Sequence, residues 1–378
     1  MHKVGIICEY NPLHAGHAHL LQCARREGTV ICVMSGAFTQ RGKAAILPPV
    51  PRAAMAIASG ADLVVELPFP YAAASARYFA TAAVRVLAGL GCDTLAFGSE
   101  SADLERLTDA ARRSLAADNA PREGLSPAVG DAAAHFAALG EVPASNDILA
   151  IEYIRAILAE DRALSPMPVL RVGDAYREGT VHSAYPSATA LRAMLARGED
   201  VSRYIPPDGM RFFEEALDTY GVADTARLGS AMLARLRAGV PTGVADCSGG
   251  LAERLVHAAA NATDYESLLR AAATKRYTDG RIARALLFLL ACVTREDLLA
   301  PPAYVRLLAA NERGREHLAK TRKTRTVPLV TKQSDAVALG ESAARQRTLD
   351  AIANGLFSLC LAKPVTPSEL ALCPPYLT

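Results

Sequence analysis

The chain has 378 residues, and 51% of them are hydrophobic, which is enough for two or three domains with sizeable cores. Its net charge of +2 neither requires nor excludes a nucleic-acid partner, so any basic surface has to be local. The eight cysteines form no C-x-x-C pair, which favours buried free thiols in a reducing compartment. No signal peptide precedes the first apolar run, and the longest strongly apolar stretch, Ala285–Val293, is too short to span a bilayer. We therefore expect a cytoplasmic protein without membrane contact.

Strand-like and helix-like segments alternate through the first half of the chain. This alternation predicts βαβ units and hence an α/β fold with a Rossmann-like parallel sheet, covered on both faces. We expect this domain to span residues 1–205, with a helical insertion near residues 102–140 and a loop over residues 174–186. The expected strands are Val4–Cys8, Thr29–Met34, Leu63–Leu67, Thr94–Phe97 and Pro168–Val172, and the expected helices are His17–Arg26, Arg52–Ser59, Ser75–Ala88, Ile148–Leu158 and Ala190–Ala196.

The alternation stops after Pro206-Pro207, and the remaining segments have mostly helical periodicity. We therefore expect a second, mainly helical domain over residues 206–378, with a C-terminal tail that returns to the body of the protein. The expected helices are Met210–Asp218, Thr225–Ala238, Gly250–Ala260, Tyr265–Ala273, Gly280–Val293 and Ala303–Leu308.

The stretch Ile6–Leu20 joins the first strand to the first helix and carries His14, Gly16 and His17 at the turn. The first N–H groups of a helix have no partner within it and bind anions, aided by the helix dipole. Two imidazoles at such a place suggest a phosphate site, and a glycine between them lets a nucleotide approach the backbone. Two alternatives remain: incidental histidines at a surface helix start, or a metal site with Glu9 and His19.

A second helix start, Ser187-Ala188-Thr189, is followed by Arg192. Two hydroxyls, free N–H groups and a cation suit a β- or γ-phosphate. The alternative is an ordinary N-cap, the commoner use of Ser-x-Thr. If both helix starts act together, they hold one triphosphate from two sides.

Several single residues could complete a nucleotide site. Gly98 would let a base or ribose lie on the backbone, or it forms a plain turn. Asn146 either contacts the nucleotide or caps its helix, and Arg171 either lies beside the nucleotide or is a solvated charge at a strand end. The loop over residues 35–43, with Gln40, Arg41 and Lys43, holds substrate or is solvated, and Glu66 needs a partner if it is buried.

Two basic runs lie in the second half. One is Lys275-Arg276-Tyr277 with Arg281 and Arg284, and the other is Lys320, Arg322, Lys323, Arg325 and Lys332. Both suit a phosphate backbone, although a run of charges is more often a solvated face. Their presence in a nearly neutral chain favours RNA as a partner.

The residues Glu9–His17 resemble the H-x-G-H signature of the nucleotidyltransferase superfamily, and Ser187–Arg192 resembles its second, I-S-[ST]-T-x-I-R-like motif. Within that superfamily the chain resembles the tRNA(Met) cytidine acetate ligases. Leu13 replaces the aromatic residue usual in that family and Leu191 replaces the usual isoleucine, and both remain apolar. The further matching blocks are Val33–Gly36 with Gln40–Gly42, Ala61–Pro68, Phe97–Glu100, Asn146–Leu149 and Lys275–Thr278.

This resemblance implies that ATP activates acetate to acetyl-adenylate, with release of pyrophosphate. The acetyl group then passes to N4 of the wobble cytidine of elongator tRNA(Met), giving N4-acetylcytidine. By the same resemblance, His14 and His17 stabilise the α-phosphate, while Ser187, Thr189 and Arg192 hold pyrophosphate, and Mg²⁺ is a plausible companion of ATP. The implied ATP-binding residues are Ile7, Cys8, Glu9, Tyr10, Asn11, Pro12, Leu13, His14, Ala15, Gly16, His17, Ala18, His19, Leu20, Gly98, Asn146, Arg171, Ser187 and Thr189. The expected RNA-binding residues are Lys275, Arg276, Arg281, Arg322 and Lys323.

Two alternatives stay open at this point. One is a small-molecule adenylyltransferase of the same superfamily, although such a substrate needs no basic helical domain. The other is a nucleotide- or RNA-binding protein without catalysis, against which the presence of His14, His17 and Arg192 together argues.

Overall fold

Five parallel strands form the centre of the protein. A computed structural model describes residues 2–119, 136, 143–171, 186–363 and 365–378. The strands lie in the order β5-β4-β1-β2-β3, and each neighbouring pair runs parallel. In β2 the side chains of Val30 through Met34 have no exposed surface, as expected for a strand covered on both faces. Their bounds are β1 His2–Cys8, β2 Gly28–Ser35, β3 Leu63–Leu67, β4 Thr94–Ser99 and β5 Ser165–Leu170.

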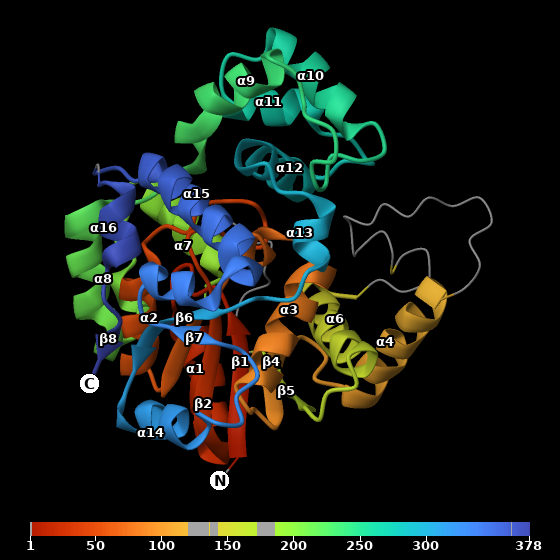
Figure 1. The fold of residues 1–378 in the computed structure, drawn as a ribbon. Helices are drawn as coiled ribbons and strands as arrows, with labels where there is room; N and C mark the ends of the chain where they lie inside the picture. The colour runs from red at the N-terminus through yellow and green to blue at the C-terminus, as the bar shows by residue number, and fades with distance from the viewer. Residues whose placement is uncertain (1, 120–135, 137–142, 172–185, 364) are drawn as a thin grey trace.

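Helices cover both faces of this sheet, which confirms the predicted α/β class (Figure 1). Alternate residues of β2 belong to opposite cores, with Ile31 and Val33 on one face and Val30 and Cys32 on the other. The face that carries Val30 packs against α1 (Ala15–Glu27), α2 (Pro49–Ala58), α7 (Ala188–Ala196) and α8 (Pro207–Tyr220). The face that carries Ile31 packs against η1 (Tyr71–Ala73), α3 (Ala76–Gly89), α4 (Leu104–Asn119) and α6 (Ser145–Ala159).

The sheet continues into the second half of the chain. Strand β6 (Val305–Ala310) pairs antiparallel with β3, and β7 (Leu329–Val330) and β8 (Tyr376–Leu377) pair with β6. The prediction of a helix over Ala303–Leu308 is therefore wrong. A short, fully buried apolar run has the same composition in a helix and in a central strand, so periodicity does not separate the two. The expected return of the tail is seen in β8.

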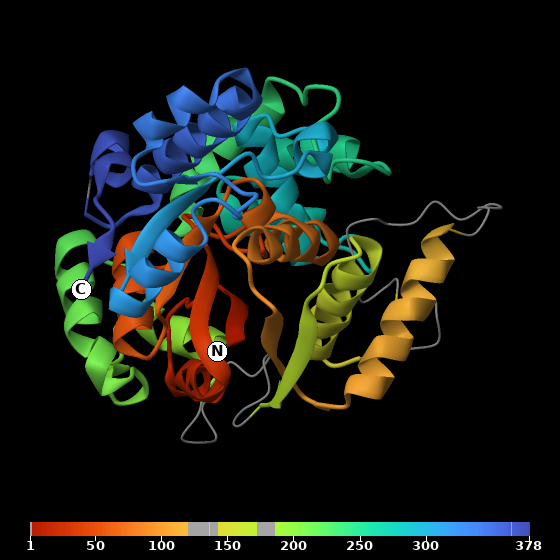
Figure 2. The same ribbon diagram turned by 60° about the horizontal axis from the view of Figure 1, so that its bottom comes forward.

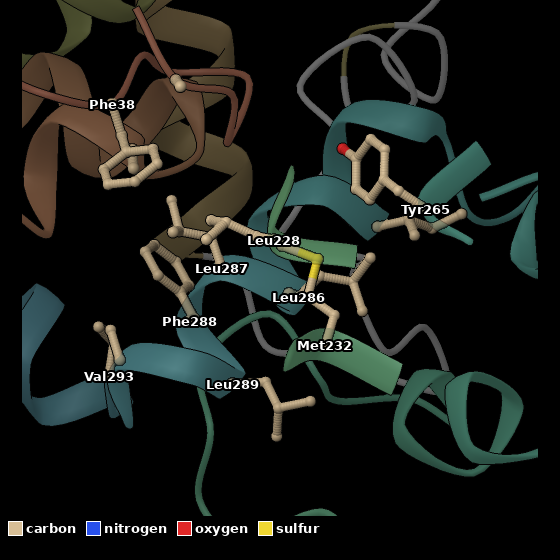
Figure 3. Packing of buried hydrophobic residues seen from close by; sticks show 14 of the residues in the cluster. Phe38, Leu228, Met232, Tyr265, Leu286, Leu287, Phe288, Leu289 and Val293 are labelled. Atoms are coloured by element: carbon tan, nitrogen blue, oxygen red, sulfur yellow. The ribbon is translucent and has the colours of Figure 1, made fainter. Parts of the chain in front are cut away.

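The helices of the second half share a core with the first half. Figure 3 shows Phe38 in the same buried cluster as Leu228 of η3 (Thr225–Leu228), Met232 of α9 (Gly229–Arg237) and Leu287 of α12 (Asp279–Ala291). The rings of Phe69 and Phe288 stack edge to face at 6.3 Å, so the two halves are packed through aromatic contacts. The bounds are η2 Ser202–Tyr204, η3 Thr225–Leu228, α9 Gly229–Arg237, α10 Leu251–Asn261, α11 Tyr265–Ala272, α12 Asp279–Ala291, α13 Arg295–Leu299, α14 Glu312–Lys320, η4 Gln333–Leu339, η5 Glu341–Ala343, α15 Ala344–Cys360 and α16 Pro367–Leu372.

Some expectations fall on residues that the structure does not describe. Of the insertion expected near residues 102–140, α4 is helical, while residues 120–135 and 137–142 lie outside the described ranges, as do residues 172–185 of the expected loop. All eight cysteines are free, and Cys292 is exposed. In the described ranges, no helix combines the length and the apolar character that crossing a membrane requires.

The carboxyl ends of β1 and β2 are held together by one buried guanidinium. Arg52, on α2, has no exposed surface. Its Nε donates to the carbonyl of Leu47 at 2.9 Å, Nη1 donates to the carbonyl of Glu9, and Nη2 donates to those of Ser35, at 3.0 Å, and Gly36. Burial lowers the pKa of Arg52 to about 10, still far above neutrality, so the cation persists.

We expect Arg52→Met to destabilise the protein by about 3–5 kcal/mol, because the substitution leaves several buried carbonyls without a donor. Urea unfolding at neutral pH measures the loss. Arg211→Met is the control, since the Arg211 side chain is 69% exposed, and its effect should stay within about 0.5 kcal/mol. Equal effects of the two substitutions would contradict the role given to Arg52.

Candidate active site

A cavity of about 710 Å³ lies at the carboxyl ends of β1, β4 and β5. Parallel α/β sheets bind ligands at this edge, at the point where the connections that follow two neighbouring strands pass to opposite faces of the sheet. Its walls come from both halves of the chain, because the first turn of α12 lines it together with the H-x-G-H segment.

The two histidines of that segment cap helix α1. Nδ1 of His14 accepts from the N–H of Gly16 at 3.1 Å, and Nδ1 of His17 lies 3.4 Å from the N–H of His14. The two rings lie 3.9 Å apart, centroid to centroid. Because Nδ1 of His14 accepts a hydrogen bond, the proton of the neutral ring is assigned to Nε2, which makes Nε2 a donor.

Both imidazoles are held neutral. Burial, followed by the positive charges of Arg171 and Arg192, lowers the pKa of His14 to about 3. The pKa of His17 is also lowered well below its usual value, by burial first and then by His14 and the same two arginines, while a hydrogen bond to the Pro12 carbonyl opposes the shift. Neutral rings surrounded by guanidinium groups are a site prepared for an anion.

The second motif lies against the first. Arg192 donates through Nη1 to the carbonyl of Asn11 at 2.7 Å and through Nη2 to Oγ1 of Thr189 at 3.0 Å. Ser187 is buried, and its Oγ accepts from the N–H of Ala190 at 3.1 Å, so it serves as the N-cap of α7. Thr189 and Arg192 line the cavity, whereas Ser187 does not.

The Glu100 carboxylate fixes the part of the cavity wall that contains Asn146 and Arg171. The Glu100 carboxylate accepts from Asn146 Nδ2 at 2.6 Å and from the backbone N–H of Asp147 at 2.9 Å. Arg171 donates to Oδ1 of Asn146 at 3.3 Å. A Cβ at Gly98 would lie 3.2 Å from Cγ of Arg171, so this glycine leaves room beside the arginine. Glu100 thus positions Asn146, a role that the sequence pattern did not reveal.

The cavity gathers most of the predicted ATP-binding residues and adds others. Pro12, Leu13, Ala15, Ala18 and Ser187 are not among its lining residues. The predicted residues that line it are Ile7, Cys8, Glu9, Tyr10, Asn11, His14, Gly16, His17, His19, Leu20, Gly98, Asn146, Arg171, Thr189 and Arg192. The lining residues that the sequence did not assign to the ATP site include Gln40, Arg41, Phe79, Phe97, Tyr153, Thr278, Asp279, Gly280 and Arg284.

The metal alternative gains no geometric support. The carboxylate of Glu9 accepts from the N–H of Gln40 at 2.8 Å, and Nε2 of His19 lies 3.8 Å from Sγ of Cys23. Within the described ranges, no three His, Cys, Asp or Glu side chains gather as a group that could hold a metal ion.

The predicted RNA-binding residues do not form one surface. Lys275 and Arg276 are exposed just before α12, close to the cavity. Arg281 is 3% exposed and donates to the carbonyl of Ser248 at 2.8 Å, so it supports the fold instead of facing solvent. Arg322 and Lys323 are exposed after α14, which contacts β2 and β3 near their amino ends, opposite the cavity (Figure 1).

Comparisons with known proteins agree with this geometry. Residues 1–369 match the profile of the family described as HIGH Nucleotidyl Transferase. The chain is 36% identical to the tRNA(Met) cytidine acetate ligase of Syntrophotalea carbinolica, over 88% of this chain and 85% of that protein. It is 34% identical to the ligase of the same name from Anoxybacillus flavithermus, over 88% and 89%.

Two solved structures are similar over the whole length. The crystal structure of apo Thermotoga maritima TmcAL has a TM-score of 0.87 at 27% identity, covering 100% of this chain and 99% of that one. The same protein bound to alpha-thio ATP has a TM-score of 0.85 at 28% identity, with the same coverage.

We expect the stability of this protein to fall as the pH is lowered from about 7 to about 5, because the unfolded chain then binds a proton that folded His14 does not. Its folded pKa is about 3, below the unfolded value, so stability is present above the unfolded pKa and is lost on acidification. His14→Asn keeps a capping side chain but removes this titration. Between pH 7 and pH 5 the free energy of unfolding of His14→Asn should therefore fall by about 1–2 kcal/mol less than that of the unchanged protein.

Urea unfolding at the two pH values measures this difference. His257→Asn, at an exposed position of α10, is the control and should lose as much stability as the unchanged protein. An identical pH dependence in His14→Asn and the unchanged protein would show that His14 is not held neutral.

Proposed function

The chain belongs to the HIGH nucleotidyltransferase family and, within it, to the tRNA(Met) cytidine acetate ligases, and we propose that it makes N4-acetylcytidine at the wobble position of elongator tRNA(Met) from acetate and ATP. The observation that carries the proposal is the junction of two helix starts. Neutral His14 caps α1, and Arg192 connects α7 to the Asn11 carbonyl just before that cap. Two helix starts and a guanidinium converging on one cavity suit a triphosphate.

In the proposed first half-reaction, a carboxylate oxygen of acetate attacks the α-phosphorus of ATP. The bond from that phosphorus to the bridging oxygen breaks, and pyrophosphate leaves in line with the attack. His14, through Nε2–H, and His17 would stabilise the charge on the α-phosphate oxygens. Thr189 and Arg192 would hold the departing pyrophosphate. Neutral donors suit this task, because they bind the developing charge without an ionisation step of their own.

In the proposed second half-reaction, N4 of the cytosine forms a bond to the acetyl carbon. The bond from that carbon to the AMP oxygen breaks, and N4 loses one proton. Acetate, ATP and tRNA are thereby converted to N4-acetylcytidine in tRNA, AMP and pyrophosphate. The adenosine of ATP would lie along Gly98, Asn146 and Arg171, where Glu100 orients the amide of Asn146.

We also propose that Mg²⁺ accompanies ATP. This ion usually binds through substrate phosphates and one or two carboxylates. Glu9 lines the cavity, and because the N–H of Gln40 donates to its Oε1, its Oε2 would be the oxygen that binds such an ion and offsets the charge of the triphosphate. On the domain scale, we assign ATP binding mainly to residues 1–205 and tRNA binding mainly to residues 206–378, although β6 joins the sheet of the first part.

One incubation tests the function. The protein is mixed with ATP, labelled acetate and total tRNA, and the release of pyrophosphate and the entry of label into tRNA are followed. Pyrophosphate release that depends on acetate, with label in N4-acetylcytidine, is the expected result. Release that requires another small acid or a phosphate would identify a small-molecule adenylyltransferase. ATP binding without turnover would identify a non-catalytic protein.

We expect His17→Ala to lower acetate-dependent exchange of pyrophosphate into ATP by about 100-fold or more, because it removes one of the two imidazoles of the proposed α-phosphate site. Circular dichroism and thermal melting check that the variant is folded. His257→Ala serves as the matched control at an exposed position and should exchange at the rate of the unchanged protein. Unaltered exchange in folded His17→Ala would rule out the role given to His17.

A further inference from the structure

A tight hairpin brings a polar tip to the cavity. Phe38 and Ala44 form an antiparallel bridge, and the N–H groups of Thr39 and Gly42 donate to the carbonyls of Lys43 and Thr39, at 2.9 and 2.8 Å. The tip of this turn is Gln40-Arg41, and both residues line the cavity. The sequence left open whether this loop holds substrate or is solvated.

The hairpin is fixed from two sides. The N–H of Gln40 donates to the Glu9 carboxylate at 2.8 Å, which joins the tip to the H-x-G-H segment. On the other side, Gly42 has a φ of +69°, and a Cβ there would lie 2.4 Å from the backbone nitrogen of Arg284 on α12. Only glycine combines this conformation with such a close approach. The tip is thus held between the H-x-G-H segment and the second half of the chain.

The first turn of α12 forms the adjoining part of the wall. Thr278, Asp279 and Gly280 line the cavity, and Asp279 is exposed, so its carboxylate is accessible from solvent. Lys275 and Arg276 precede this turn on the surface. The cavity wall therefore offers a carboxylate and, from the hairpin, a guanidinium, with two further cations on the surface just before α12.

Two parts of the cavity wall already have occupants in the proposed function, on which this inference rests. Adenosine would lie along Gly98 and Asn146, and pyrophosphate along Thr189 and Arg192. The acceptor base must nevertheless enter the same cavity, because N4 has to reach the acetyl carbon attached to the α-phosphate. Of the parts that the nucleotide would leave open, the wall formed by the hairpin tip and α12 carries charged side chains, whereas Phe79, Phe97 and Tyr153 form an aromatic part.

Cytosine has a hydrogen-bonding pattern that matches this wall. Its N4 amino group donates, whereas its N3 and O2 atoms accept. Carboxylates accept from N4 of cytosine, and guanidinium groups donate to base acceptors. Unpaired bases of RNA loops are recognised along these edges after they leave their stack.

We propose that Arg41 and Asp279 form the subsite for the acceptor cytosine. Asp279 accepts a hydrogen bond from N4 and thereby selects cytosine over uracil, whose corresponding atom is a carbonyl oxygen. Arg41 donates to the N3–O2 edge, and Lys275 and Arg276 bind the phosphates that flank the base. Recognition of the acceptor thus lies opposite the adenosine wall, at the junction of the two halves of the chain.

Two assays separate this subsite from the ATP site. Acetate-dependent exchange of pyrophosphate into ATP is measured without tRNA, and acetyl transfer is measured with tRNA(Met). For Arg41→Ala and Asp279→Asn we expect exchange within about three-fold of the unchanged protein and transfer lowered by about 10-fold or more. Arg211→Ala and Asp208→Asn are the matched controls, the latter because Asp208, like Asp279, lies in the first turn of a helix. Both controls should resemble the unchanged protein in both assays.

A binding assay tests selectivity directly. Anticodon stem-loops with cytidine or uridine at the wobble position are compared, and the unchanged protein should prefer cytidine by about 10-fold. Asp279→Asn should abolish most of this preference, because an amide can donate to the uracil carbonyl. A merely structural role of Asp279 would weaken both stem-loops equally.

Three results would overturn the subsite. Exchange and transfer falling together in Arg41→Ala would place Arg41 in the ATP site. Unaltered transfer in both variants would show that the hairpin and α12 do not recognise the acceptor. An unchanged preference of Asp279→Asn for cytidine over uridine would show that Asp279 does not make the selective contact with N4. Failure of the proposed function itself gives a different result, since the unchanged protein would then acetylate no tRNA.

Discussion

The buried guanidinium of Arg52 is the interaction on which the geometry of the active site depends. It donates to the carbonyl of Glu9, which directly follows β1, and to that of Ser35, the last residue of the neighbouring strand β2. Carbonyls at the ends of parallel strands have no further strand partner, and leaving them unpaired inside the protein costs free energy. A single side chain from α2 satisfies them together, and so the two segments that reach the cavity from β1 and β2 keep a constant separation.

The electrostatic character of the cavity depends mostly on the N-termini of helices that line it. Helices α1, α6, α7 and α12 all contribute residues of their first turns or caps to the cavity. The first N–H groups of α6 donate to the Glu100 carboxylate, so the starts of α1, α7 and α12 are the ones that favour a bound anion, and they do so together more than any one of them would. The imidazole that caps α1 is part of this arrangement, because Nδ1 of His14 holds the helix start and leaves Nε2 as the donor.

The second half of the chain lines the cavity and shares a core with the first half. Phe38 and Phe69 belong to the same core as Phe288 and Phe357, and Gly42 touches the backbone of α12. Figure 2 shows the teal and blue helices of the second half lying along one side of the first half. Because this packing fixes the cavity wall, the distance between the H-x-G-H segment and the first turn of α12 is set by the fold and not by a linker.

The sequence alone was sufficient for the elements whose signal is local. Continuous apolar runs identified β1, β2, β3 and β4, most of whose side chains are buried, and the motif around His14 and His17 identified the helix start that lines the cavity. The sequence was insufficient wherever the structure of a segment, or the partner of a side chain, depends on residues that are far away along the chain. Whether Val305–Ala310 is a strand depends on β3, whether Arg281 faces RNA or the Ser248 carbonyl depends on the packing of α12, and whether Ser187 meets a phosphate or the Ala190 N–H depends on how α7 is placed. Arg41 and Asp279 are far apart along the chain, and only the close approach of Gly42 to α12 brings them to one cavity.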